Sequence, residues 1–139
     1  MRPKIETEEH GAIWRVMLEG DSLPELFDAI GRFIGGTNPC ATGVPGEWEF
    51  VSIATSGPDA LLAAWVNLLV EKARTESQLY AAHRDVNITR QRDGQFAVEG
   101  WIRCEPVTSW SSPLRGISTS GIRVESTDGR WHAELQFDV

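Results

Sequence analysis

Two stretches of helical periodicity lie among stretches of strand-like alternation, and this order limits the folds that the chain can adopt. Apolar residues at helical spacing occupy residues 22–34 and 56–75. Alternation with a period of two, or a short apolar run between turn signals, predicts strands at residues 12–19, 47–55, 79–90, 95–104, 114–126 and 130–138. The first nine residues are polar and predict no element. The order β-α-β-α-β-β-β-β predicts an α+β fold of two layers, a mixed sheet with both helices packed on one face.

Signals at the ends of these segments support the same order. Ser22 and Glu25 have the spacing of a capping box, and Asp59 lies where it complements the positive end of the second helix. Arg-Asp-Gly at 92–94 and Thr-Asp-Gly at 127–129 predict two hairpin turns. We therefore expect one hairpin from residues 79–90 and 95–104 and a second from residues 114–126 and 130–138.

Length and charge narrow the classes of protein. The 139 residues suffice for one domain spanning 1–139. No apolar run approaches the ~18 residues of a membrane span, and the N-terminus has no apolar signal-peptide core, so we expect a cytoplasmic protein with no membrane partner. A net charge of −7 repels phosphate, so we expect a protein partner and no direct contact with nucleic acid.

Acidic residues lie at the start of the first predicted strand and at the end of the last one. Glu9 and His10 precede the first strand, and Asp138 and Val139 end the last. If these two strands are antiparallel neighbours, the residues meet with the terminal carboxylate, a set that suits a hard divalent cation. The alternative is that they are solvated charges at strand ends.

Two further residues are candidates for contact with a partner. Arg115 precedes a Ser/Thr/Gly-rich strand, where it would counter the carboxylates or touch a phosphate-bearing ligand, unless it is an ordinary surface arginine. Trp110 fits no periodic face and is either a contact anchor or a residue that packs its loop onto the domain. Recognisable catalytic motifs such as GxSxG, a P-loop or HExxH are absent from the sequence, so it predicts no catalytic residue. The other tryptophans on apolar faces predict core positions: Trp14, Trp48, Trp65 and Trp131.

Four segments together resemble the archease family. LLAAWVNLLVEKARTE at 61–76 resembles the archease signature in which a Leu-Leu pair precedes Trp-Leu-Asn. SLPELFDAIGRFI at 22–34 is similar to the segment that precedes it, and GIRVESTDGRWHAELQFDV at 121–139 is similar to the terminal hairpin of the family. RGISTSG at 115–121 resembles Lys-Ala-Val-Thr-Tyr-His-Gly. The resemblance covers nearly the whole chain and implies an archease-like fold.

The resemblance also implies a function. Archease proteins look like non-enzymatic cofactors of a GTP-dependent, manganese-using RNA ligase in tRNA splicing and RNA repair, and they are thought to help the active-site histidine of the ligase become guanylylated. The resemblance implies a metal site as well, with Ca²⁺ or Mn²⁺ held by an aspartate of an Asp-His-Thr-Ala-Asp motif and by the penultimate aspartate with the terminal residue.

Carried over residue by residue, this site is only partly retained. Residues 9–13, Glu-His-Gly-Ala-Ile, lie where the motif is expected, so Ile13 replaces an aspartate that binds metal. Asp138 and Val139 are retained, Glu9 keeps a charge, and Arg115 lies at the position of the lysine. The chain is therefore expected to be a divergent archease that activates the ligase. The alternative is a diverged binding module with the same fold, a different protein or small-molecule partner, and no metal.

Overall fold

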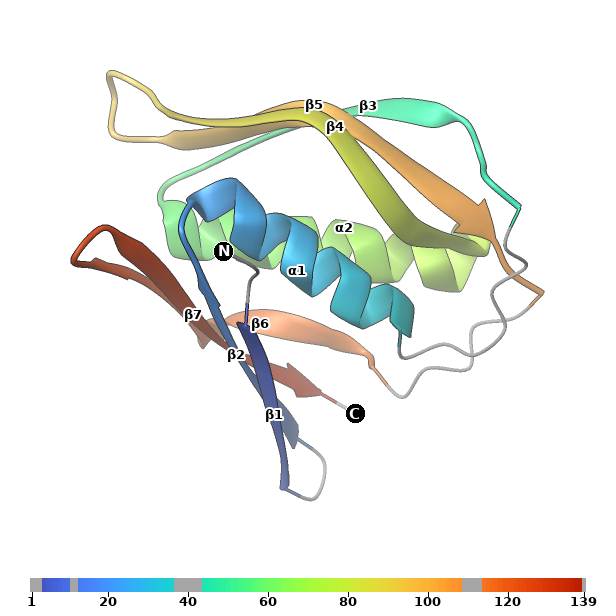
Figure 1. Ribbon diagram of the computed structural model, residues 1–139, viewed down its shortest axis with the longest axis horizontal. Helices are drawn as coiled ribbons and strands as arrows, with labels where there is room; N and C mark the ends of the chain where they lie inside the picture. Colours follow the sequence, from blue (N-terminus) through green and yellow to red (C-terminus); the bar gives the residue numbers. More distant parts are fainter. Residues whose placement is uncertain (1–3, 11–12, 37–43, 109–113, 139) are drawn as a thin grey trace.

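The computed structural model describes residues 4–10, 13–36, 44–108 and 114–138 (Figure 1). Side chains of residues 4–10 and 118–120 are not part of this description. The described elements in chain order are β1 (Lys4–His10), β2 (Ile13–Gly20), α1 (Leu23–Gly36), β3 (Trp48–Thr55), α2 (Pro58–Glu76), β4 (Gln78–Arg90), β5 (Phe96–Pro106), β6 (Gly116–Thr127) and β7 (Arg130–Asp138).

The strands form two antiparallel sheets, and the helices lie between them. One sheet has the strand order β1-β2-β7-β6 and the other the order β3-β5-β4. All strand pairs are antiparallel in the described chain. Both helices contact both sheets, which gives three layers (Figure 1). The predicted α+β class is confirmed, whereas the predicted single mixed sheet with both helices on one face is wrong.

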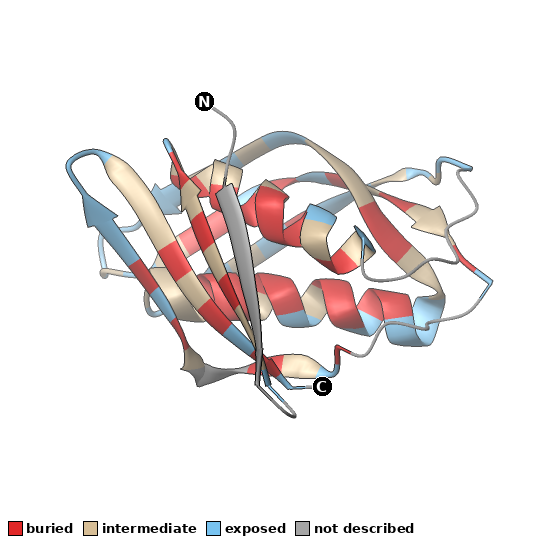
Figure 2. Cartoon of the chain, turned by 60° about the horizontal axis from the view of Figure 1, so that its bottom comes forward, coloured by how far each residue is buried: buried red, intermediate tan, exposed pale blue. Residues whose placement is uncertain are grey.

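Burial along α2 gives the physical reason for the third layer. A helix that faces one sheet buries a single stripe and leaves the other side polar. The buried residues of α2 instead run almost continuously along the helix, because a sheet lies on either side of it (Figure 2). They are Leu61, Leu62, Ala63, Trp65, Val66, Leu69, Val70, Lys72 and Ala73. None of the described helices is long and apolar enough to cross a membrane.

β1 is a strand that the sequence did not predict. It pairs with β2 from Lys4 opposite Glu19 to His10 opposite Ile13 and forms an edge of the first sheet. Its sequence, KIETEEH, is mostly charged and therefore shows no apolar alternation. Charged residues on an edge strand discourage pairing with other chains. The expectation that the first nine residues form no element is wrong for this reason.

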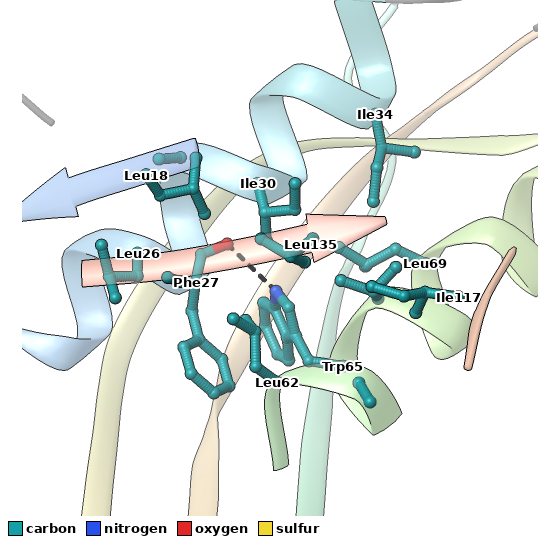
Figure 3. Packing of buried hydrophobic residues seen from close by; sticks show 14 of the residues in the cluster. Leu18, Leu26, Phe27, Ile30, Ile34, Leu62, Trp65, Leu69, Ile117 and Leu135 are labelled. Carbon is teal, nitrogen blue, oxygen red and sulfur yellow. Dashed lines mark hydrogen bonds between the residues drawn. The ribbon is translucent and has the colours of Figure 1, made fainter. Parts of the chain in front are cut away.

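Trp65 of α2 joins the two helices in the core. Its side chain is 1% exposed, and its indole N–H donates a hydrogen bond to the carbonyl oxygen of Phe27 at 3.0 Å (Figure 3). Its ring lies 5.5 Å from the Phe27 ring and 6.3 Å from the Tyr80 ring. A buried indole needs such a partner for its donor. Trp65 is therefore a core residue, as the sequence predicted.

Close packing of β4 on α1 depends on glycine. A Cβ atom added at Gly31 would lie 2.7 Å from the Tyr80 ring, and one at Gly35 would lie 2.9 Å from the carbonyl oxygen of Tyr80. Any larger residue at these two positions forces the helix and the strand apart. The two glycines thus allow Tyr80 to pack directly against α1.

Side chains of α2 pair with the free edge of β6. Asn67 accepts from the amide of Ile117 and donates to its carbonyl oxygen, both at 3.2 Å. Asp59 accepts from the amide of Val124 at 2.7 Å. These bonds replace part of the ladder that an edge strand lacks. Asn67 is a residue of the archease-like signature, and the structure gives it this packing role.

Helix starts and hairpins follow the sequence signals. The Glu25 carboxylate accepts from the backbone amides of Asp21 and Ser22, which is one half of the predicted capping box. Asp128 and Gly129 have φ values of 52° and 78°, the pair of left-handed residues that a type I′ hairpin requires. They join β6 to β7 as predicted.

Candidate functional site

The last residue of β1 and the last residue of β7 lie at the same end of the first sheet. β2 and β7 are antiparallel neighbours, and Ile13 lies opposite Asp138. His10 lies opposite Ile13 on one side, and Gly116 lies opposite Asp138 on the other. We call His10, Ile13, Asp138 and Gly116 the terminal row. The geometry on which the sequence argument depended is therefore present at the level of the backbone.

Ile13 and Asp138 share the outer face of the sheet. Side chains alternate between faces along a strand, and directly opposed residues lie on the same face. The buried positions of β2 and β7, among them Val16 and Leu135, face the helices, so Ile13 and Asp138 face away from them. Ile13 is 42% exposed, and Asp138 is exposed as well. An exposed isoleucine thus lies directly beside the penultimate aspartate.

Glu9 lies outside the terminal row in this register. It lies opposite Trp14, which packs against the core, whereas His10 lies opposite Ile13. The side chains of Glu9 and His10 and the whole of Val139 fall outside the described residues. The proposed roles of these three residues as metal ligands stay predictions.

The described donors of the terminal row do not fit a divalent cation. A hard cation takes six or more oxygen ligands, and proteins usually supply several carboxylates. Asp138 is the single described carboxylate in the row, and the side chain of Ile13 carries no donor atom. Among the described residues no group of three His, Cys, Asp or Glu side chains could hold a metal ion. We therefore assign no chemical step to a metal.

Arg115 lies beside Asp138 through a backbone bond. Its amide donates to the carbonyl oxygen of Asp138 at 2.8 Å, and its side chain is exposed. Leu114 anchors the segment, because it is 1% exposed. Gly116 follows with φ of 146°, a conformation that side chains disfavour. Arg115 is therefore held next to the terminal row, whereas Trp110, the other predicted contact residue, lies outside the described residues.

A large bulge in β6 adjoins the row. Ile117 lies opposite Phe137 and Ile122 opposite Leu135, so residues 118–121 face Gln136 alone. Bulges often lie beside functional sites, where they redirect the chain. A shallow pocket of about 140 Å³ opens next to the bulge, lined by Gly121, Ile122, Arg123, Glu134 and Gln136.

Asp138 differs in pairing from other acids on the same sheet. Glu134 forms an ion pair with Arg15 at 2.7 Å, and Glu19 pairs with Arg130 at 3.0 Å. Within the described part of the chain Asp138 makes no ion pair. A carboxylate without a partner at the surface is free to meet a cationic group of another molecule.

A second cluster of titratable side chains fastens β4 to α1. Tyr80 donates to Asp28 Oδ1 at 2.6 Å, Arg32 donates to Asp28 Oδ2 at 3.0 Å, and His83 Nε2 lies 3.6 Å from Asp28 Oδ1. Burial, and then the bond to Asp28, raises the pKa of Tyr80 above its usual range, so its hydroxyl stays protonated. The carboxylate of Asp28 is thus occupied by donors and is not a free general base.

A pocket of about 470 Å³ lies near the buried Lys72. The ammonium group of Lys72 is 2.6 Å from Glu49 and 3.6 Å from Glu76, so its charge is already compensated. Cys104 also lines this pocket, and burial raises the pKa of its thiol to about 11. A thiol with such a pKa is not a nucleophile at neutral pH.

One exposed group of aromatic residues was missed at the sequence level. Trp48, predicted as a core residue, is only half-buried and lies on the outer face of the β3-β5-β4 sheet with Arg84 and Arg103 over its ring. Phe50 and Trp101 lie beside it with 51% and 36% exposure. The sequence did contain a signal for this surface: Trp101 lies on the opposite face of its strand from the alternating apolar residues. Trp14 and Trp131 do pack against the core as predicted.

Comparisons with known proteins agree with this architecture. Protein 1598 of Methanobacterium thermoautotrophicum, solved in solution, matches with a TM-score of 0.70 at 16% identity, covering 97% of this chain and 98% of that one. The crystal structure of an archease, a possible chaperone, from Thermotoga maritima matches with a TM-score of 0.60 at 11% identity, covering 96% of each chain. These likenesses show the fold alone, and no curated protein matches by sequence. The Archease protein family (MTH1598/TM1083) matches residues 6–139. The chain therefore belongs to the Archease protein family.

Proposed function

We propose that the protein is a non-enzymatic accessory protein that docks on a GTP-dependent RNA ligase and promotes its guanylylation, in the cytoplasm, in tRNA splicing or RNA repair. Family membership over residues 6–139 supports an accessory role, and the Thermotoga maritima relative is described as a possible chaperone.

The observation that carries the proposal is the exposed carboxylate of Asp138 at the terminal row, which makes no ion pair with the residues that the structure describes. It lies on an exposed sheet face next to Arg115, whose amide holds the backbone of Asp138. One exposed carboxylate and one exposed guanidinium thereby lie on residues whose backbones are hydrogen-bonded to each other. Such a pair complements a surface that carries a cation and a phosphate, as a ligase with bound nucleotide does.

The chain's own residues suffice for a positioning mechanism. Asp138 would pair with a basic side chain of the ligase, and Arg115 would contact a phosphate of the bound nucleotide. Both contacts would favour the arrangement in which the ligase histidine attacks that nucleotide. The exposed Ile13 would add apolar contact in place of the family's acid.

A guanylylation assay tests the proposal. The ligase from the same cell is incubated with labelled GTP, with and without this protein, and the covalent guanylate is quantified. We expect wild-type protein to raise the rate and Asp138→Ala and Arg115→Ala to lose most of the gain. Glu99→Ala is the matched control, because Glu99 is an exposed acid on β5, in the sheet on the other side of the helices. No rate gain with the wild type, or equal gains with all variants, would contradict the proposal.

Ile13 supports a second candidate function, a binding module that kept the fold and takes another protein or small-molecule partner without metal. An apolar and 42% exposed residue at the centre of the row would suit an apolar contact better than an ionic one. One simple observation distinguishes the two functions. A source genome that encodes no such ligase would favour the second.

A further inference from the structure

The outer face of the β3-β5-β4 sheet carries an aromatic cluster that the proposed ligase contact does not use. Trp48 and Phe50 come from β3, Arg84 from β4, and Trp101 and Arg103 from β5. We call these five residues the aromatic–arginine face. The helices cover the other side of this sheet, so the face points away from the terminal row, which lies on the outer side of the opposite sheet (Figure 1).

Register brings the five side chains together in two rows. Phe50 lies opposite Trp101, and Trp101 lies opposite Arg84. The rings of Phe50 and Trp101 meet edge to face at 5.4 Å. In the next row Trp48 lies opposite Arg103. Opposed residues on one sheet face are in direct contact, so the cluster is one continuous surface.

Two arginines are held over the tryptophan rings of this face. The Arg84 guanidinium lies 4.7 Å from the Trp48 ring and 5.7 Å from the Trp101 ring, and that of Arg103 lies 5.1 Å from the Trp48 ring. Stacking fixes a guanidinium and leaves its N–H donors at the edge. Arg103 makes no ion pair within the described part of the chain, and its Nε is buried without a hydrogen-bond partner there. Among the described residues, Arg84 forms one ion pair, with Asp85 at 3.9 Å.

Composition of the face is typical of a protein contact. Trp, Phe and Arg are enriched at interface hot spots, whereas exposed large apolar side chains are otherwise scattered singly. Phe50 is 51% exposed and Trp101 is 36% exposed, and the two are in contact. Exposed apolar area and the guanidinium groups of two stacked arginines therefore coincide at one place.

Access to the rings and the arginine donors decide which occupant fits. Base stacking by single-stranded nucleic acid needs open ring faces, but guanidinium groups lie over the Trp48 and Trp101 rings. A second copy docked by a two-fold axis would bring the arginines of both copies together. Carboxylates on an apolar segment complement both the arginine donors and the exposed rings.

We propose that the aromatic–arginine face is a docking surface for a carboxylate-bearing, apolar segment of a partner protein. Its arginines bind carboxylates through the N–H groups at their edges, and Phe50 and Trp101 pack against the apolar side chains of the segment. This surface is separate from the terminal row, so the protein can hold two partners at once.

An NMR titration locates the binding. The probe is a short peptide of alternating Glu and Leu residues, with a Gln-Leu peptide and a short oligouridylate as comparisons. The Glu-Leu peptide is expected to shift the indole N–H signals of Trp48 and Trp101 and to leave that of the buried Trp65 in place. The Gln-Leu peptide is expected to bind roughly tenfold more weakly, because each hot-spot arginine loses its charged partner. Arg84→Gln/Arg103→Gln is expected to weaken the Glu-Leu peptide by a similar factor.

Three further variants separate the surface from other effects. Phe50→Ser, at an exposed position, is expected to weaken the peptide without lowering the unfolding midpoint. Arg74→Gln, an exposed arginine of α2, and Asp138→Ala are expected to leave peptide binding unchanged, even if the ligase proposal fails. Equal binding of the Glu-Leu and Gln-Leu peptides, signals at Trp48 and Trp101 that move only with oligouridylate, or signals that do not move at all would overturn the inference.

Discussion

Ile13→Asp is the substitution that tests the terminal row most sharply. It places a carboxylate opposite Asp138 at a cross-strand Cβ distance of about 5 Å. Two unit charges at that distance repel by about 0.8 kcal/mol in water, and both positions are exposed, so the water value applies. We therefore expect Ile13→Asp to be about 0.5–1 kcal/mol less stable than Ile13→Asn in a chelator at low salt. The Asn control removes the same apolar side chain without adding charge.

Added calcium should reverse this difference. A weak calcium site has a dissociation constant of about 1 mM, and a ligand at ten times its dissociation constant adds about 1.4 kcal/mol to stability. We expect about 10 mM Ca²⁺ to stabilise Ile13→Asp by that amount relative to Na⁺ at equal ionic strength, and to leave Ile13→Asn and the double variant Ile13→Asp/Asp138→Asn unchanged.

Urea unfolding followed by tryptophan fluorescence measures both effects. If Ile13→Asp and Ile13→Asn unfold at the same urea concentration in chelator, the two carboxylates are not neighbours and the assigned register is wrong. If the charge effect is present but calcium has none, the row lacks the further ligands that a cation needs.

Three other expectations concern packing and protonation. Gly31→Ala should destabilise the protein by about 1–3 kcal/mol, because the added methyl group clashes with Tyr80. In a Tyr80→Ala background the clash is gone, so the same substitution should stabilise the protein through the ~1 kcal/mol helix preference of alanine over glycine. Urea unfolding of the wild type, both single variants and the double variant would show this change of sign. Asn67→Leu should cost about 1–2 kcal/mol, because two backbone groups at the β6 edge lose their partner, and amide exchange at that edge should quicken. Burial raises the pKa of the Cys104 thiol from 9.0 to about 11, so in a Cys40→Ser background this thiol should resist alkylation at pH 8 and react once urea unfolds the protein. Because the thiol ionises at lower pH in the unfolded state than in the folded state, the free energy of unfolding should fall as the pH rises from about 9 to 11.

Local signals in the sequence predicted most of the elements. Glu25 fixes the start of α1, and the left-handed pair Asp128-Gly129 fixes the last hairpin, because each acts over a few residues. β1 was missed since its side chains are charged. The division into two sheets was missed for a different reason. The division into sheets depends on which strands pair, and this pairing is not encoded locally. The residues that α2 buries run almost continuously along the helix, so the single apolar stripe inferred from the sequence was too narrow.

The pairing of the first predicted strand with the last was expected from the sequence, and the structure confirms it. The backbones of Asp138 and Arg115 are hydrogen-bonded, whereas the roles of both residues stay predictions. Side chains alternate between the two faces of a strand, but this alternation identifies the buried residues only when it is known which face points inward. Trp48 was assigned to the core because it lies on an apolar face of its strand, but that face is the outer one, and two arginines lie over the Trp48 ring.

Where the ligase touches this protein is the most direct test of the account. A photo-reactive residue is placed at Ile13 in one variant and at Phe50 in another, and each is irradiated with the GTP-dependent RNA ligase. The terminal row predicts a covalent product with the ligase from position 13 and none from position 50. A product from position 50 alone, or from neither position under conditions that raise guanylylation, would contradict the proposed mode of action.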